Sequence, residues 1–450
     1  MAKRNWSHPS VQKFSPDSDP VAAMVSRARQ TVLNAQDEGW SGPPFDPTQL
    51  AAILKIPVVP SQDIPDARTV PVGANRLQIE FNPERPTARV RYSIAHEIAH
   101  TFFPDCSDRI QNRLQAADIS DDEWQLEMLC NIGASEILMP VGSFPELRSE
   151  ALSIDRLMEL RKEFGVSAEA LLLRLARLTE APCTMFAASC SDETVSNARY
   201  AIDYAVGSRA WPKKTLGRIP LPKTTVLAEC TAIGFTAHGQ ESWPRVDFDV
   251  HVECVGIPPY PGRRLPRVVG FATPCKTLPI TAPTIKYVRG DALQPRGDGV
   301  HIIAHVVNDV TPNWGGGFAR VVRNRWTAVQ TDFKKWWDAH QGKPSLGETR
   351  LVEADSGVYV FSMLAQHGLG GSSGRRKIRY NALARCLENL SETARDLDAR
   401  VHMPRIGCGQ AGGSWTVVAE LIDDTLVTQG VEALVYDLPD QKPPAQRELF

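Results

Sequence analysis

The sequence Arg-Tyr-Ser-Ile-Ala-His-Glu-Ile-Ala-His occupies residues 91–100 and decides how the N-terminal part of the chain is interpreted. On a helix, residues four positions apart lie on the same face, so His96 and His100 can bind one metal ion together. Glu97 lies beside them, placed to take a proton from water at that metal. The neighbouring positions are largely apolar, and burying two imidazoles among them without a partner is costly. The pattern therefore favours a metal site over two ordinary polar positions on a surface helix.

A second helical run supplies further candidate groups. Glu127 begins the stretch Glu-Met-Leu-Cys-Asn, and Asn131 follows it by about one helical turn. A catalytic zinc ion needs three protein ligands and an open fourth position. We expect Glu127 to be the third ligand and Asn131 to orient a ligand imidazole by a hydrogen bond. The alternative is that Glu127 is a solvated acid.

These motifs resemble a known family. Residues 91–100, the run EMLCNIGASEILMP at 127–140 and the run KEFGVSAEALLLRLARL at 162–178 look like the ImmA/IrrE metallopeptidases, over about residues 21–180. The resemblance implies a zincin-like domain in which His96, His100 and Glu127 bind zinc. It also implies that Glu97 is the general base and that Asn131 supports the ligands. The implied partner is a protein substrate, typically a helix-turn-helix repressor that is cut once.

Length and composition limit the classes of protein that this chain can belong to. Its 450 residues are enough for two to four domains. Hydrophobic residues make up 42 % and charged residues 23 %, values typical of folded globular proteins. The 50 basic and 52 acidic residues nearly balance, giving a net charge of −2. A broad basic surface is therefore not expected, and neither is strong direct nucleic-acid binding.

Cysteine usage and hydropathy predict the compartment. Nine cysteines without a CxxC pair indicate reduced thiols rather than a disulfide framework. The N-terminus lacks the apolar segment of a signal peptide, and no apolar run is long enough to span a membrane. We therefore expect a cytoplasmic protein without a membrane partner.

Periodicity divides the chain into segments. Apolar residues at three- and four-residue steps predict a mainly helical domain over residues 21–180, interrupted by a hairpin at 69–81. Residues 181–282 contain more Pro and Gly and alternate in polarity, which predicts a β-rich segment. From 283 to 440, strand-like and helix-like runs alternate, as in an α/β domain. Residues 1–20 and 441–450 are expected to be flexible tails.

Three loops of the C-terminal segment are candidates for ligand binding. Asp291 follows the first strand, a run of three glycines at 315–317 precedes a helix, and a third loop spans 407–413. Glycine-rich turns at helix N-termini present backbone N–H groups to anions, so these loops can hold a diphosphate. From composition alone, tight turns that bind nothing explain them equally well.

The same segment resembles the macro domains, which bind ADP-ribose. The resemblance rests on RGDA at 289–292, AHVVNDVTPNWGGGFARVV at 304–322, MPRIGCGQAGGSW at 403–415 and VYDLP at 435–439. It implies a mixed sheet between helices, with Asp291 accepting from the adenine amino group and Tyr436 stacking on adenine. A half-buried strand aromatic explains Tyr436 equally well. The other implied contacts are Asn308, Gly315, Gly316 and Gly317 at the distal ribose, and Gly407, Cys408, Gly409, Gln410, Ala411 and Gly412 around the diphosphate.

Together these features predict a zinc-dependent, site-specific endopeptidase that ADP-ribose or a related nucleotide controls or targets. The alternative is an ADP-ribosyl hydrolase or ADP-ribose reader whose N-terminal domain is a scaffold. Against hydrolysis, residues 363–366 and 410–411 lack the lysine and aspartate that some related hydrolases use. Asp309, His305 and His367 are candidates for other chemistry, although such residues beside a ligand loop are more often structural. No function is predicted for residues 181–282.

Overall fold

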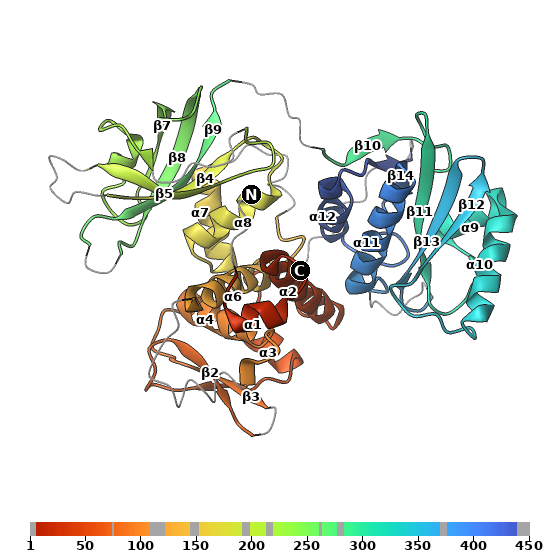
Figure 1. Cartoon of the computed structure of the whole chain (residues 1–450), viewed down its shortest axis with the longest axis horizontal. Helices are drawn as coiled ribbons and strands as arrows, with labels where there is room; N and C mark the ends of the chain where they lie inside the picture. Colours follow the sequence, from red (N-terminus) through yellow and green to blue (C-terminus); the bar gives the residue numbers. More distant parts are fainter. Residues whose placement is uncertain are drawn as a thin grey trace. The chain divides into compact units, whose positions relative to one another are not determined.

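The computed structural model describes residues 6–73, 76–107, 122–144, 153–190, 199–212, 219–260, 263–276, 283–369 and 376–438. These residues form helices and three β-sheets (Figure 1), as expected for a multidomain chain. The chain separates into one compact unit of residues 1–28, 42–139 and 144–282 and another of residues 29–41, 140–143 and 283–450. Among the helices that the structure describes, none has both the length and the apolar character of a membrane span. The finer domain boundaries expected from the sequence stay predictions.

The N-terminal part of the first unit combines helices with a small sheet. Its helices are α1 (Pro9–Phe14), the first half of α2 (Pro20–Asp37), α3 (Pro47–Ile53), α4 (Thr87–His100), α6 (Glu123–Leu138), α7 (Ile154–Phe164) and α8 (Ala168–Leu178). Strand β3 (Leu77–Phe81) lies between β1 (Val58–Pro60) and β2 (Ala67–Pro71). It runs parallel to β1 and antiparallel to β2. The β2–β3 pair is the hairpin that the sequence predicts, and its turn residues 74–75 lie outside the described residues.

Helix α1 forms within the segment that was expected to be a flexible tail. Its Val11 is fully buried in an apolar cluster that includes Met24 of α2 and Leu126 of α6. The side-chain oxygen of Gln125 accepts hydrogen bonds from the backbone N–H groups of Ser7 and His8. Residues of α6, about a hundred positions away, therefore help to hold α1, and local composition does not reveal them. The predicted C-terminal tail, 441–450, lies outside the described residues.

A six-stranded antiparallel sheet forms the rest of the first unit. Its order is β6 (Ile219–Pro220), β5 (Tyr200–Gly207), β4 (Thr184–Cys190), β9 (Arg267–Pro274), β8 (Asp249–Ile257) and β7 (Thr236–Ser242), with a 3-10 helix η2 (Val226–Glu229). Alternation along β8 buries Val250, Val252 and Cys254 completely. On its other face, Glu253 accepts a hydrogen bond of 2.7 Å from the backbone N–H of Ile154. This carboxylate therefore caps the start of α7.

The second unit is built on a six-stranded mixed sheet. The order is β10 (Lys286–Arg289), β15 (Ala433–Asp437), β14 (Ala399–Pro404), β11 (Val300–Asn308), β13 (Val358–Gln366) and β12 (Thr349–Asp355). All neighbours are parallel except β12, which is an antiparallel edge strand. Helices α9 (Gly317–Arg325) and α10 (Thr327–Ala339) pack on one face, and α11 (Tyr380–Asp396) and α12 (Trp415–Thr425) on the other (Figure 1). A 3-10 helix, η3 (Val427–Gln429), precedes β15.

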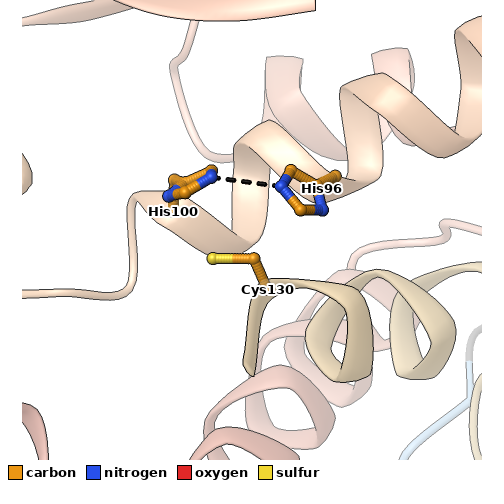
Figure 2. Close-up of side chains that lie close together, drawn as sticks. All are labelled: His96, His100 and Cys130. Carbon is orange, nitrogen blue, oxygen red and sulfur yellow. Dashed lines mark hydrogen bonds between the residues drawn. The ribbon is translucent and has the colours of Figure 1, made fainter. Parts of the chain in front are cut away.

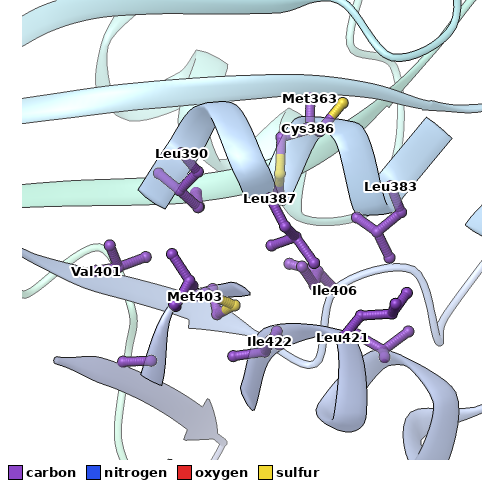
Figure 3. Packing of buried hydrophobic residues seen from close by; sticks show 14 of the residues in the cluster. Met363, Leu383, Cys386, Leu387, Leu390, Val401, Met403, Ile406, Leu421 and Ile422 are labelled. Carbon is purple, nitrogen blue, oxygen red and sulfur yellow. The ribbon is translucent and has the colours of Figure 1, made fainter. Parts of the chain in front are cut away.

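Apolar side chains at helical spacing attach α11 to this sheet. Figure 3 shows them packed against side chains of β14 and α12. The buried residues are Leu383, Cys386, Leu387 and Leu390 of α11, Val401 and Met403 of β14, and Leu421 and Ile422 of α12. Each large apolar side chain buried in this way contributes about 1.5–3 kcal/mol to folding. This core fixes the strands whose ends carry the predicted ligand loops.

Asp37, at the end of α2, belongs to the second unit and lies at the N-terminus of α11. Its carboxylate accepts a hydrogen bond of 3.5 Å from the backbone N–H of Tyr380. Burial raises the pKa of Asp37 to about 6 from its ordinary value of 3.8, against the opposing effect of Arg376. The carboxylate thus accepts from a backbone N–H group of the first turn of α11, where helix N–H groups have no acceptor within the helix. The interaction requires a charged group to be buried, which costs free energy.

We expect the substitution Asp37→Asn to stabilise the second unit at neutral pH and not in acid. Because the folded pKa is raised, the stability that Asp37 contributes is fully present below pH 3.8 and is lost as the pH rises through about 6. The variant should match wild type at low pH and exceed it by up to about 3 kcal/mol at pH 7. Hydrogen–deuterium exchange of α11 peptides at each pH measures this difference. Asp396→Asn, at the exposed end of the same helix, is the control, and an Asp37→Asn effect that is equal at both pH values would contradict the assignment.

Candidate functional site

Helix α4 positions the predicted metal ligands. Four apolar side chains, Ile94, Ala95, Ile98 and Ala99, are buried and fix this helix within the first unit. His96 and His100 point from the adjoining face, and their Nε2 atoms lie 3.1 Å apart. Two imidazoles four residues apart therefore meet at one point, as the spacing predicts.

Helix α6 packs against α4 and brings Glu127 to the two imidazoles. Its Oε2 atom lies 3.1 Å from His96 Nε2, and its Oε1 atom lies 3.5 Å from His100 Nε2. The Glu127 side chain is 42 % exposed, whereas those of His96 and His100 are 14 % and 12 % exposed. The cluster is thus partly buried and open to solvent on the Glu127 side.

The donor atoms of this cluster fit a zinc ion. Imidazole nitrogens and carboxylate oxygens are ligands that Zn²⁺ prefers in proteins. Here two nitrogens and a carboxylate converge within 3.5 Å, close to the separations that a shared tetrahedral ion requires. The assignment of His96, His100 and Glu127 as ligands stays a proposal and is taken up below.

Glu97 is held by a side chain that the sequence analysis did not identify. The hydroxyl of Thr69, on β2, donates a hydrogen bond of 2.7 Å to Glu97 Oε2. Burial raises the pKa of Glu97, and the Thr69 hydrogen bond opposes this effect. A carboxylate with a raised pKa exchanges a proton more readily near neutral pH. Periodicity places Thr69 on a strand but does not show which helix that strand meets.

Asn131 takes part in a hydrogen bond with Tyr92. The Tyr92 hydroxyl donates to Asn131 Oδ1 at 2.6 Å. Burial raises the pKa of Tyr92 to about 12, so the hydroxyl keeps its proton at neutral pH. The orientation of a ligand imidazole by Asn131 stays a prediction.

Cys130 is a second group that the sequence analysis did not identify. It follows Glu127 by three residues on α6, so both side chains lie on the same side of that helix. The ligand atoms of Cys130, His96 and His100 all lie within 4.8 Å of one another. Figure 2 shows the two imidazoles on α4 and the sulfur of Cys130 facing them from the neighbouring helix. In the sequence, the three-residue spacing between Glu127 and Cys130 is the feature that indicates this side chain.

In the second unit, the predicted ligand residues gather at one edge of the sheet. Five strands, β10, β15, β14, β11 and β13, are parallel, so their carboxyl ends lie together. Asp291 follows β10, Asn308 ends β11, and the 407–413 loop follows β14. In open α/β sheets, ligands bind beside the carboxyl ends of the strands. The structure therefore brings these predicted contacts to the edge where a ligand is expected.

The two glycine-rich loops meet each other at this edge. A β-carbon added to Gly316 would lie 3.0 Å from the side-chain oxygen of Gln410. Gly317 begins α9, which leaves Gly315 and Gly316 just before a helix N-terminus. The other loop is anchored at Ala411, whose carbonyl accepts from the backbone N–H groups of residues 377 and 378 at 2.8 and 3.0 Å. At Gly407 a positive φ of 73° and a contact with Ile378 favour glycine.

Several predicted contact residues also shape their own loops. Asp291 Oδ1 accepts from the backbone N–H of Leu293 at 2.9 Å, which leaves its second oxygen for other contacts. Asn308 Oδ1 accepts from the backbone N–H groups of residues 310 and 311 at 3.0 and 2.9 Å. Burial raises the pKa of Cys408 to about 12, so its thiol is neutral. The hydrogen bonds of Asp291 and Asn308 thus help to set the conformation of their own loops.

Tyr436 lies in β15 and is 4 % exposed. Its hydroxyl lies 2.9 Å from His402 Nδ1, and His402 Nε2 lies 3.0 Å from His301 Nδ1. Burial lowers the pKa of His402 to about 4, so the His402 imidazole is neutral at neutral pH. Stacking of Tyr436 on adenine stays a prediction.

Among the other candidates, Asp309 and His367 form a pair at the same edge. His367 Nδ1 lies 2.7 Å from Asp309 Oδ2, and the His367 side chain is 58 % exposed. His305 lies inside the sheet, where it is 1 % exposed and burial lowers its pKa to about 3. His305 is therefore a structural residue, whereas the Asp309–His367 pair is accessible.

Comparison with known proteins identifies the N-terminal part. Residues 59–176 match the family model of the IrrE N-terminal-like domain. The chain contains an IrrE N-terminal-like domain. The chain is 31 % identical over 105 residues to the radiation response metalloprotease IrrE of Deinococcus deserti. The matched region covers 23 % of this chain and 37 % of that protein. The IrrE resemblance seen in the sequence is thereby confirmed.

The chain is also similar to other known proteins. The chain is 28 % identical over 170 residues to the mouse chromodomain-helicase-DNA-binding protein 1-like, covering 35 % of this chain and 18 % of that protein. It is 38 % identical to the structure of a macrodomain protein from Streptomyces coelicolor, covering 34 % of this chain and 98 % of that one, with a TM-score of 0.30. The match to this chain covers only 18 % of the mouse protein and 37 % of the Deinococcus deserti IrrE protein, well under two thirds of the length of either relative.

Proposed function

We propose that the IrrE-like domain is a zinc-dependent, site-specific endopeptidase. The observation that carries the proposal is the convergence of His96, His100 and Glu127 within 3.5 Å, on two helices of a domain that matches the IrrE family. Glu97 lies on the same helix as the two imidazoles and is held by Thr69. This set contains the groups that metal-assisted peptide hydrolysis needs.

The chemistry divides between the metal and Glu97. His96, His100 and Glu127 would hold the zinc ion, which would supply a Lewis acid for the scissile carbonyl and would lower the pKa of an adjacent water molecule. Glu97 accepts the proton of the attacking water and donates it to the leaving amine. The raised pKa of Glu97 makes its carboxylate a stronger base and so favours the first transfer, and the hydrogen bond from Thr69 holds the carboxylate in place for both transfers.

The neighbouring sheet supports a polypeptide substrate. Strand β2 is an edge of the described sheet and carries Thr69, which contacts Glu97. An edge strand offers backbone N–H and C=O groups with which an extended peptide can pair. A substrate segment beside β2 would therefore lie close to the general base. We propose that this segment belongs to a regulatory protein such as a helix-turn-helix repressor.

We further propose that the second unit binds ADP-ribose or a related nucleotide, which controls or targets cleavage. Two glycine-rich loops that meet at Gly316 and Gln410, both just before helix N-termini, support an anion site. Free ADP-ribose would stimulate cleavage if it acts as a signal. It would compete with the substrate if the pocket recruits an ADP-ribosylated protein.

Calorimetric titration of ADP-ribose into the zinc-loaded full chain tests the nucleotide proposal. We expect saturable binding that Asp291→Ala weakens about tenfold or more, because a lost hydrogen bond to a charged group costs about 1.5–3 kcal/mol. Asp298→Ala is the matched control, since Asp298 is exposed and precedes β11, at the opposite end of that strand. If the folded protein does not bind ADP-ribose, the proposal that the second unit is a nucleotide-binding domain is wrong.

The Asp309–His367 pair favours a second candidate function, ADP-ribosyl hydrolysis. An aspartate bound to one ring nitrogen leaves the other nitrogen of an exposed histidine able to act as a base. This reading predicts release of ADP-ribose from a modified protein that is abolished by His367→Ala and unaffected by Glu97→Gln. Release that survives His367→Ala would exclude the pair as its source.

A further inference from the structure

Cys130 gives the metal cluster a fourth donor atom. Its ligand atom and those of His96 and His100 all lie within 4.8 Å (Figure 2), and Glu127 oxygens lie 3.1 and 3.5 Å from the same imidazoles. In a tetrahedral zinc site, neighbouring donor atoms are roughly 3.3–3.6 Å apart. Small side-chain shifts therefore suffice to place all four donors on one ion.

Four protein ligands are one more than hydrolysis needs. A catalytic zinc ion keeps one position open, whereas a zinc ion with four protein ligands is closed to water and substrate. With Glu127 and a Cys130 thiolate both bound, the site would be electrically neutral. With Glu127 alone it carries a net positive charge, which is costly in a partly buried position. The charges thus favour the closed arrangement when no substrate is present.

The surroundings of Cys130 also favour sulfur on the metal. The residue is fully buried in an apolar cluster with Phe103, Leu126 and Leu129. Water cannot solvate a thiolate there, so a bound divalent cation is the partner that stabilises the charge. Zinc binds thiolates well and deprotonates them on binding. A serine hydroxyl at this position would bind zinc far more weakly.

We propose that the Cys130 thiolate is the fourth ligand of the bound metal and that substrate must displace it. This inference rests on the proposed zinc site. Glu127, on the exposed side, keeps its place with His96 and His100, while Cys130 alternates between the metal and the apolar cluster. The resting protein is then a closed zinc site, and opening it is a step that controls cleavage.

Cobalt substitution of the full-length protein tests the proposal without a peptidase substrate. A cobalt–thiolate bond gives a charge-transfer absorption in the near ultraviolet that nitrogen and oxygen ligands do not give. We expect one bound Co²⁺ with this band in wild type, and one bound Co²⁺ without it in Cys130→Ser. Cys183→Ser, which alters another fully buried cysteine of the same unit, should keep the band.

Acetohydroxamate, which binds open positions on such metals, tests displacement directly. Added to the cobalt-loaded wild type, it should lower the charge-transfer band, and it should bind Cys130→Ala at least about tenfold more tightly. A wild type that binds Co²⁺ without the band overturns the inference and leaves the zinc peptidase standing. Hydroxamate binding that leaves the band unchanged overturns the displacement step. A wild type that binds no metal overturns the peptidase proposal itself.

Discussion

Glu97→Gln is expected to slow cleavage of the protein substrate by about 10²–10⁴-fold while leaving one zinc ion bound. Glutamine has nearly the same shape and can keep a hydrogen bond with Thr69, but it cannot accept a proton from water. The metal ligands are unchanged, so the loss falls on the proton transfer alone. Quantitative gel analysis of cleavage, together with zinc content by atomic absorption, measures both effects.

The matched control for this substitution is Glu80→Gln. Glu80 lies on β3 and pairs with the exposed Arg68 at 2.8 Å, so it is a nearby acid in a surface ion pair. Its neutralisation should change cleavage by less than about twofold, since such pairs contribute little. A Glu97→Gln protein that cleaves at the wild-type rate would assign the base to another residue.

Glu136→Ala is expected to destabilise the IrrE-like domain by about 3–5 kcal/mol. Glu136 lies on α6, the helix that carries Glu127, and its side chain is 1 % exposed. Its Oε1 atom lies 3.7 Å from Arg174 Nη1, which is also 1 % exposed, and 3.4 Å from Arg177 Nη1. Removing this carboxylate takes a buried counter-charge away from the Arg174 guanidinium. The rate of hydrogen–deuterium exchange in α6 and α8 peptides measures the loss.

An exposed pair of the same kind is the control for Glu136. Glu159 and Arg156 on α7 lie 2.9 Å apart, with side chains 68 % and 45 % exposed. Glu159→Ala should cost less than about 1 kcal/mol, because solvent screens the pair. Equal effects of the two substitutions would show that burial of Glu136 is not what stabilises α6.

The parts of the site that the sequence predicts are those set by spacing within one helix. His96, Glu97 and His100 share α4, so their arrangement follows from helical geometry alone. Thr69 reaches Glu97 from a strand 28 residues earlier in the chain. That contact depends on how β2 packs against α4, which no local pattern contains. Cys130 follows Glu127 by three residues, a spacing that places both side chains on the same side of α6. Its apolar surroundings, however, are those of an ordinary core cysteine.

The fold shows the same division between local and distant causes. Alternation and helical periodicity predict the β-rich segment and the α/β segment, because each strand or helix face is buried by its own neighbours. Helix α1 is buried by residues of α2 and α6, and composition alone suggests a tail. Asp37 caps α11 from 343 residues away, a contact that periodicity within α2 does not reveal.

The second unit illustrates a limit of a different kind. Ordered motifs predict which loops lie together, since parallel strands place their carboxyl ends at one edge. They do not predict the Asp309–His367 pair, which arises because β11 and β13 are adjacent and Asn308 is in register with Gln366. Strand order, which is a property of the whole sheet, decides that contact.

The most direct test of the account labels new protein N-termini in an extract of the source cells. The extract is incubated with zinc-loaded wild type and, separately, with zinc-loaded Glu97→Gln, each with and without ADP-ribose. The account predicts one or a few new termini, in a regulatory protein, that appear with wild type and are absent with Glu97→Gln. The same new termini with both proteins, or none with either, would contradict the claim that this zinc site cuts protein.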